Sequence, residues 1–404
     1  MKRVLANWAL CAGLCFPLAA APPDRALDFL EAKVKADPDD FIAWNQLGER
    51  CLARRRETGD EAWLARAAHA AAASLKAIPA ESNPAGLALR ARVDLASHRF
   101  ADARDRARKL SDLQPGKPAP LIILADALLE LGDYDEAART LGALEPLSPL
   151  DTATRRARLA LARGQRDEAR VLFTTARDTA KTLTPTQPQL LAWCEVQLGE
   201  LVHRSGDWDA AGPRYLAALE AVPEWWSALD HLAELRAAQG RTDEAFAIYE
   251  KLIARIPRPE LLQAIGDLHL FLGKADAAKP WHDRALAAYL DATAKGSVAY
   301  YHHLAGFYSD SRPDPAAALD AARKDAALRK TAAAHDALAW ALYKSGDTKA
   351  AIAEIALAAG PRDAHILQHT AMIRISAGDV AGGQAALREA AAVNPRFNAF
   401  HVHR

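Results

Sequence analysis

The stretch Leu198–Pro223 reads LGELVHRSGDWDAAGPRYLAALEAVP and decides the fold of this 404-residue chain. Leu198 and Gly199 open the inner face of a first helix, which breaks at the turn around Gly206. A second helix follows, and small and large residues share its inner face at helical spacing: Trp208, Ala211, Tyr215 and Ala218. The small residues let two helices approach closely and the large ones fill the remaining space. The stretch therefore predicts an antiparallel helical hairpin that ends at Pro223.

The same hairpin pattern recurs along most of the chain. Turn glycines at Gly206, Gly240 and Gly273 are separated by 34 and 33 residues, and Gly346 and Gly378 by 32. Glycine can take the left-handed conformation that ends the first helix, and an aspartate directly after it can cap the second. We count about ten helical hairpins. The clearest copies lie in residues 119–290, and more degenerate copies lie in residues 40–118 and 297–398.

The repeated hairpin resembles the tetratricopeptide repeat (TPR), a helix–turn–helix unit of about 34 residues with small and large residues in this order and a closing proline. Glu195 departs from the family pattern, which usually has tryptophan there. The resemblance implies an all-α fold over residues 22–404, a right-handed α-solenoid of stacked antiparallel hairpins. It also implies that the first helix of each pair lines a concave groove. Strand-like alternation and βαβ units are missing between the repeats.

The resemblance places twelve side chains toward that groove. They are Trp193, Glu200, His203, Arg204, Asp230, Glu234, Gln263, Asp267, His302, Asp336, Trp340 and Tyr343. A mixed lining of aromatics and carboxylates suits an extended peptide or a partner helix. We therefore expect a protein–protein interaction scaffold or adaptor that binds a peptide or partner segment of unknown identity along the groove. The alternative is that these side chains are solvated and hold no ligand.

The groove lining leans acidic. The best-known peptide-binding members of the TPR family clamp a C-terminal carboxylate with lysine, arginine and asparagine, and no such run is visible here. An acidic lining instead favours a basic or neutral segment.

Histidine is concentrated toward the C-terminus, where nine of the 13 histidines lie beyond residue 260. His365 and His369 are four residues apart on one expected helix, a spacing that can bring both imidazoles to one metal ion. Successive repeats could bring His302, His303 and Asp336 toward them. Imidazole and carboxylate ligands would suit Zn²⁺ or Ni²⁺. A metal-binding or metal-handling protein is thus the alternative function, unless these histidines only pack against aromatic residues of the core.

Motifs of known catalytic sites are missing from the chain. It has no GxSxG elbow, no GxxxxGK[ST] phosphate loop and no GxGxxG after a strand. Paired carboxylates such as Asp135 and Glu136 fall in the first turn of second helices, where they favour the positive end of the helix dipole. We expect a non-enzymatic protein, with an enzyme or an accessory subunit of one as the remaining rival.

The charge balance and the N-terminal sequence limit the expected partners and cellular location. Lys+Arg and Asp+Glu balance at 51 each, so we expect no nucleic-acid partner. Lys2 and Arg3 precede an apolar run over residues 4–18 and then three alanines, a pattern typical of a signal peptide over residues 1–21. The run is too short for a comfortable membrane span. We expect a periplasmic or secreted protein without a stable span after cleavage, the alternative being an apolar N-terminal helix of a cytosolic protein.

Two cysteines, Cys51 and Cys194, would remain after signal cleavage. They lie several repeats apart, and a solenoid brings only neighbouring repeats together. We therefore expect no disulfide between them and a buried, apolar role for each.

Two adjacent tryptophans, Trp225 and Trp226, follow the closing proline of the deciding stretch. A tandem tryptophan at the junction of two hairpins predicts either a partner hot spot or a plug for the seam between repeats.

Overall fold

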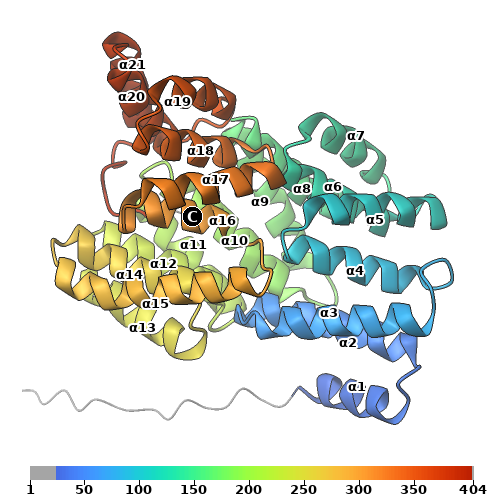
Figure 1. Ribbon diagram of the computed structural model, residues 1–404. Helices are drawn as coiled ribbons and strands as arrows, with labels where there is room; N and C mark the ends of the chain where they lie inside the picture. Colours follow the sequence, from blue (N-terminus) through green and yellow to red (C-terminus); the bar gives the residue numbers. More distant parts are fainter. Residues whose placement is uncertain (1–23, 403–404) are drawn as a thin grey trace, which may run out of the picture.

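The computed structural model describes residues 24–402, so the predicted signal peptide of residues 1–21 lies outside the described part. Between residues 24 and 402 the chain is built of helices joined by short turns and has no strand (Figure 1). A single helix, α1 (Arg25–Ala36), precedes ten helix pairs. The all-α helical-repeat prediction is confirmed.

Consecutive helices pair along the whole array. The first five pairs are α2 (Phe41–Thr58) with α3 (Ala62–Ala77), α4 (Pro84–Ala96) with α5 (Phe100–Leu113), α6 (Pro118–Leu131) with α7 (Tyr134–Leu144), α8 (Pro149–Ala162) with α9 (Arg166–Thr182), and α10 (Pro188–His203) with α11 (Trp208–Ala221). The other five are α12 (Trp226–Ala238) with α13 (Thr242–Arg255), α14 (Pro259–Phe271) with α15 (Ala275–Ala294), α16 (Tyr301–Gly306) with α17 (Pro315–Leu328), α18 (Ala332–Lys344) with α19 (Thr348–Ile355), and α20 (Ala364–Ser376) with α21 (Val380–Val393).

The α10–α11 hairpin shows why this sequence folds into such pairs. Gly206 ends the first helix with φ of 77°, a value that favours glycine. The Asp207 carboxylate then accepts a hydrogen bond from the Ala210 N–H at 3.1 Å and caps α11. Between the helices the Tyr215 ring is fully buried against Gly199, where any Cβ would collide with the ring. The small-and-large packing predicted from the sequence is therefore present.

The α16–α17 pair is irregular. After α16 the chain makes a π-helical turn, Phe307–Ser311, before Asp314 caps α17. Such turns are uncommon in helices and often occur at functional sites. Here the turn carries Asp310 to the indole of Trp340, whose Nε1–H donates to the Asp310 carboxylate at 2.9 Å.

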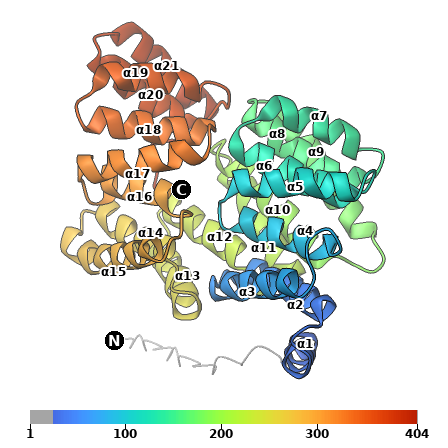
Figure 2. The same cartoon turned by 45° about the vertical axis from the view of Figure 1, so that its right-hand side comes forward.

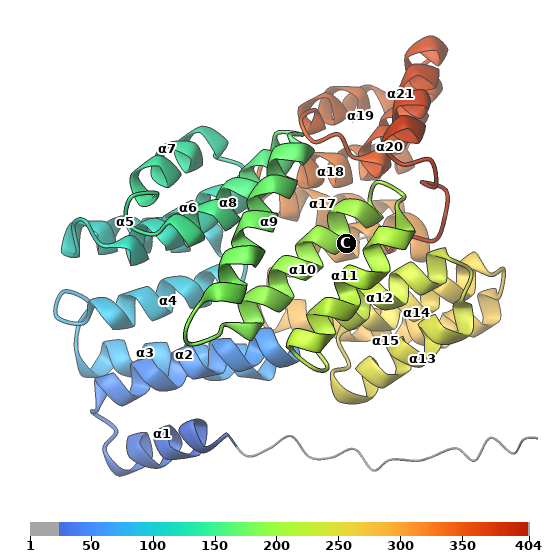
Figure 3. The same ribbon diagram turned by 180° about the vertical axis from the view of Figure 1, so that it is seen from behind.

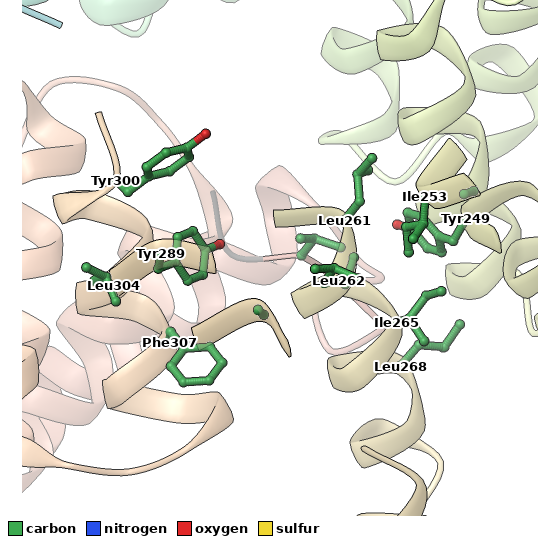
Figure 4. Close-up of a cluster of buried hydrophobic side chains, with 14 of the residues drawn as sticks. Tyr249, Ile253, Leu261, Leu262, Ile265, Leu268, Tyr289, Tyr300, Leu304 and Phe307 are labelled. Carbon is green, nitrogen blue, oxygen red and sulfur yellow. The ribbon is translucent and has the colours of Figure 1, made fainter. Parts of the chain in front are cut away.

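The largest apolar core lies in the C-terminal half of the array (Figure 4). Its buried rings Tyr249, Tyr289 and Phe307 come from successive repeats and are joined by aliphatic side chains of α14. Phe400 and Val402 also belong to this core, although they follow the last helix. Residues 400–402 are therefore part of the packed interior.

The superhelix also makes contacts between distant repeats. Figure 2 shows α2–α9 on one side and α13–α21 on the other, with α12 between them. The Trp226 indole N–H donates to the Arg56 carbonyl at 3.1 Å, and the Arg258 guanidinium donates to Glu61 at 2.9 Å. The backbone N–H of Lys330 donates to the Leu131 carbonyl at 2.8 Å. These contacts join residues far apart in the sequence, so the array touches itself.

We call residues 394–402 the C-terminal tail. It leaves α21 and returns to the middle of the molecule, where the end of the chain is marked in Figures 1 and 3. The Arg396 guanidinium lies 4.3 Å from the ring of Trp208 on α11, and the ring of Phe400 meets that of Phe271 edge-on at 5.6 Å. The tail thus crosses the central repeats.

Candidate functional site in the concave groove

The concave surface holds two adjoining cavities. The first, of about 440 Å³, lies among α10, α12, α14, α20 and the C-terminal tail, and we call it the groove pocket. The second, of about 220 Å³, lies among α16, α18 and α20, and we call it the histidine pocket. The first is within the size range of ordinary ligand sites, about 300–1,000 Å³.

The structure brings most of the predicted groove residues to these cavities. The groove pocket is lined by Glu200, His203, Arg204, Glu234, Asp267 and Trp340. The histidine pocket is lined by His302 and Asp336, again with Arg204 and Trp340.

Four predicted groove residues line neither cavity. Trp193 packs edge-on against Phe173 at 5.7 Å, and Tyr343 stacks beside Trp340 at 5.0 Å. Gln263 is buried and accepts a hydrogen bond from the Tyr289 hydroxyl at 2.8 Å, and Asp230 is also buried. These side chains support the repeats rather than the cavity surface.

The groove pocket is acidic. To the predicted carboxylates the structure adds Asp310 from the π-helical turn and Asp363 from the segment before α20. Arg204 reaches Asp363 at 3.3 Å. Burial favours the neutral form of this carboxyl, but the interactions with Arg204 and His401 and the backbone N–H groups of His365 and Ile366 together outweigh burial, and the pKa of Asp363 is lowered. The carboxylates of the pocket thus outnumber its cations, Arg204 and the tail's Arg396.

One predicted groove residue, His203, is neutral at physiological pH. Burial lowers the pKa of His203 to about 4. Its Nδ1 lies 3.3 Å from the Tyr215 hydroxyl, so the imidazole is tied to the hairpin core as well as to the pocket.

Sequence reasoning missed the C-terminal tail. The backbone N–H of Val402 donates to Glu234 at 3.1 Å, and His401 Nδ1 lies 2.9 Å from the same carboxylate. Phe400 and Val402 are 5% and 2% exposed, so the tail is anchored and not merely adjacent. The alternation of Phe400, His401 and Val402 beyond the last helix was the available signal, because alternate residues of an extended segment point to the same side.

The histidine pocket brings together three of the five predicted metal-ligating residues. Asp336, His365 and His369 each offer a ligand atom, and these atoms lie within 4.8 Å of one another. His302 lines the same pocket, but its Nδ1 lies 3.2 Å from Asp325. His303 stacks on the ring of Tyr289 at 6.1 Å instead.

A membrane span requires a helix that is both long and apolar. None of the helices of residues 24–402 combines the length and the apolar character required to cross a bilayer.

Comparisons with known proteins agree with the repeat architecture. Two stretches, residues 94–159 and 196–258, match family models described as tetratricopeptide repeat, and the second contains Leu198–Pro223. Cellulose synthase operon protein C of Pseudomonas fluorescens (strain SBW25) is 29% identical over 168 residues, which are 41% of this chain and 13% of that protein. The matched segment therefore spans a small part of that relative.

Solved structures are similar at low identity. Yeast Tom70 shares 14% identity over 87% of this chain and 92% of its own, with a TM-score of 0.40. A thermophilic TPR protein of Thermus thermophilus, TTC0263, shares 20% identity over 51% of this chain and 99% of its own, also with a TM-score of 0.40.

Proposed function

Since the chain is a tetratricopeptide-repeat protein, and such repeats serve as scaffolds for protein partners, we propose that its groove pocket binds an extended peptide segment with basic and aromatic side chains. The segment would lie along α10, α12 and α14, with its cationic groups against the carboxylates of the pocket. Proteins of this family are generally non-catalytic, in keeping with a binding role.

The C-terminal tail is the observation that carries this proposal. It is a segment with the stated chemistry, turned over residues 395–399 and without turns over residues 400–402, and it already lies in the pocket. Arg396 supplies its cationic group and His401 an imidazole in contact with Glu234, and Phe400 and Val402 supply its buried apolar anchors. A partner segment of the same chemistry could make the same contacts once the tail leaves.

The contacts of the tail also indicate how such a segment is held. Glu234 accepts the Val402 N–H, and hydrogen bonds to a charged acceptor are stronger than neutral ones. Glu234 is 4% exposed, so its carboxylate acts in surroundings that screen it weakly. The apolar anchors contribute most of the remaining affinity, because burying large side chains dominates peptide recognition. Glu234 is therefore the residue on which binding should depend most.

A tethered tail competes with any free segment. A short flexible tether gives an effective concentration of roughly 1 mM. A tail that is docked at least about nine-tenths of the time then has a dissociation constant of roughly 100 µM or less for the same site. A free peptide should bind with that affinity to a chain whose tail is released. It should bind about tenfold more weakly to the wild type, whose own tail occupies the pocket.

The test uses the full chain with the tail released by the pair Phe400→Asp and Val402→Asp. The probe is a fluorescent peptide with the sequence of residues 394–402, followed by anisotropy. We expect a dissociation constant of about 100 µM or tighter for the opened chain, and roughly tenfold weaker binding by the wild type.

A charge reversal in the opened chain provides the matched comparison. Glu234→Lys should weaken peptide binding at least about tenfold, because it replaces the acceptor of the peptide N–H with a like charge for the basic segment. Glu220→Lys, on the exposed face of α11, makes the same charge change outside the pocket and should leave binding unchanged. Equal affinities for these two variants, or no binding by the opened chain, would refute the proposal.

A further inference from the structure

Three potential metal ligands meet at the base of the histidine pocket. Asp336 comes from α18, and His365 and His369 come from consecutive turns of α20. Asp336 and His369 are both buried, and His365 is half-buried. The helix pair therefore holds two imidazoles and a carboxylate at one point, partly shielded from water.

The orientation of His369 is fixed by its neighbours. Its Nδ1 lies 3.1 Å from both oxygens of Asp336, and its ring stacks on Trp340 at 3.9 Å. The ring of His365 meets it edge-on at 4.1 Å. Side chains held in this way lose little freedom when they bind an ion, which favours binding.

We propose that Asp336, His365 and His369 form a binding site for one divalent transition-metal ion, with Zn²⁺ as the best-suited ion. Two imidazoles and a carboxylate are an established donor set for zinc, which takes nitrogen and oxygen ligands at about 2.0–2.2 Å. Ligand atoms on one tetrahedral ion are about 3.3 Å apart at these bond lengths. The present separations of up to 4.8 Å need a contraction of about 1.5 Å, which rotation of the half-buried His365 side chain can supply.

A second histidine–aspartate pair in the same protein shows what distinguishes the site. His282 Nε2 lies 2.9 Å from Asp267, and the imidazole is buried like that of His369. Its ring meets that of Phe307 edge-on, and no second histidine or cysteine joins this pair among the described residues. The pair His282 and Asp267 is therefore a structural pair that matches His369 and Asp336 without the third ligand.

The proposal is independent of peptide binding in the groove pocket. It predicts an ion at the α18–α20 pair whether the tail is docked or released, and its test involves no peptide. Failure of one proposal would leave the other intact.

The experiment is calorimetric titration of the untagged, chelator-treated full chain with ZnCl₂. We expect one ion per chain with a dissociation constant of about 1 µM or tighter, and no heat of binding with MgCl₂, because Mg²⁺ prefers all-oxygen ligands. His365→Ala and His369→Gln should each weaken zinc binding at least about tenfold. His282→Gln should leave it unchanged.

Co²⁺ provides a second measurement that does not depend on heat. A tetrahedral Co²⁺ site gives intense visible absorption, which should appear with the wild type and His282→Gln and be lost in His365→Ala. Circular dichroism establishes that each variant is folded, and His365 is half-buried, so its replacement tests the site without emptying the core. A wild type that binds no zinc, or an equal loss of zinc affinity in His282→Gln, would overturn the proposal.

Discussion

Arg258 joins two distant parts of the superhelix, and its replacement by alanine should loosen that contact. Its guanidinium donates to Glu61 at 2.9 Å and to the Gly59 carbonyl at 3.1 Å, both in the turn between α2 and α3. It also binds Glu260 in its own repeat and lies 4.7 Å from the ring of Trp226. One side chain therefore holds the α2–α3 turn against α12 and α14.

The magnitude follows from the carboxylate that Arg258 leaves behind. Burial opposes ionisation of Glu260, but the charge and hydrogen bond of Arg258, with smaller contributions from His303 and a backbone N–H, together outweigh burial and lower the pKa of Glu260 to about 2. Removing one partner of such a buried pair typically costs about 3–5 kcal/mol. With an unfolding entropy of about 2.1 cal/mol/K per residue, a loss of about 3 kcal/mol lowers the melting temperature of a chain of this size by about 3–4 °C.

The assay combines thermal melts with hydrogen exchange. Arg258→Ala should lower the melting temperature and speed amide exchange at the end of α2, whereas the added change Glu260→Gln should restore part of the melting temperature. Arg258→Lys keeps the positive charge but loses the planar guanidinium, so its melting temperature should fall between those of the wild type and Arg258→Ala. A melting temperature within about 1 °C of the wild type, or no rescue by Glu260→Gln, would refute the reasoning.

The pair also predicts a dependence on pH. The folded pKa of Glu260 lies below its ordinary value of 4.5, so its contribution is complete above pH 4.5 and is lost as the pH falls toward 2. Unfolding by urea at pH 5 and pH 3 should show this loss in the wild type and a smaller loss in Arg258→Ala.

Three further predictions concern titration, metal binding and thiol reactivity. Burial lowers the pKa of His303 to about 3, so below pH 6.5 the unfolded chain binds a proton that the folded chain does not. In urea titrations the free energy of unfolding of the wild type should therefore fall by about 2 kcal/mol between pH 7 and pH 5, and that of His303→Gln should not show this loss. His401 lies on the tail with its Nδ1 2.9 Å from Glu234, outside the group Asp336, His365 and His369, so His401→Ala should leave the zinc affinity in calorimetry unchanged, and a loss of about tenfold or more would contradict a site that is independent of the tail. Burial raises the pKa of Cys51 to about 11 and that of Cys194 to about 12. In a chain that starts at residue 22, both thiols should therefore resist Ellman's reagent until guanidinium unfolds the protein, and a reaction in the folded state would contradict their burial.

Local features of the fold could be predicted from the sequence because each lies within one hairpin. Gly199 faces Tyr215 across two adjacent helices, and Gly206 and Asp207 form the turn that joins them. The tandem tryptophan was open to two interpretations. Trp225 is buried in a core cluster of α10–α12, as expected of a plug, whereas Trp226 bonds to a distant helix.

Contacts between distant repeats could not be predicted in the same way. Arg258 and Glu61 are 197 residues apart, and their meeting depends on the small rotations that accumulate over five repeats. A single hairpin does not specify that sum. The tail was missed for the same reason, since its place depends on where the superhelix brings Glu234 and Phe271.

Part of the candidate site could be predicted from the sequence. The face of a helix on which a residue lies is easier to infer than the partner with which its side chain pairs. Asp336, His365 and His369 converge because the spacing on α20 and the order of the repeats are both regular. His302 and His303 do not join them, since Asp325 and the ring of Tyr289 already hold them. Partners of this kind are set by the packing of neighbouring repeats.

Contacts between distant repeats also have a mechanical consequence. An α-solenoid whose repeats touch only their neighbours can extend under force like a soft spring. In this protein the bonds of Trp226 to Arg56, Lys330 to Leu131 and Arg204 to Asp363 join one part of the coil to another. A pull on the two ends must break these bonds before the coil lengthens, so the molecule should stay stiff at low force and then yield in steps. The width of the groove therefore depends on bonds outside its lining, those of Trp226 and Lys330, as well as on the Arg204–Asp363 pair within it.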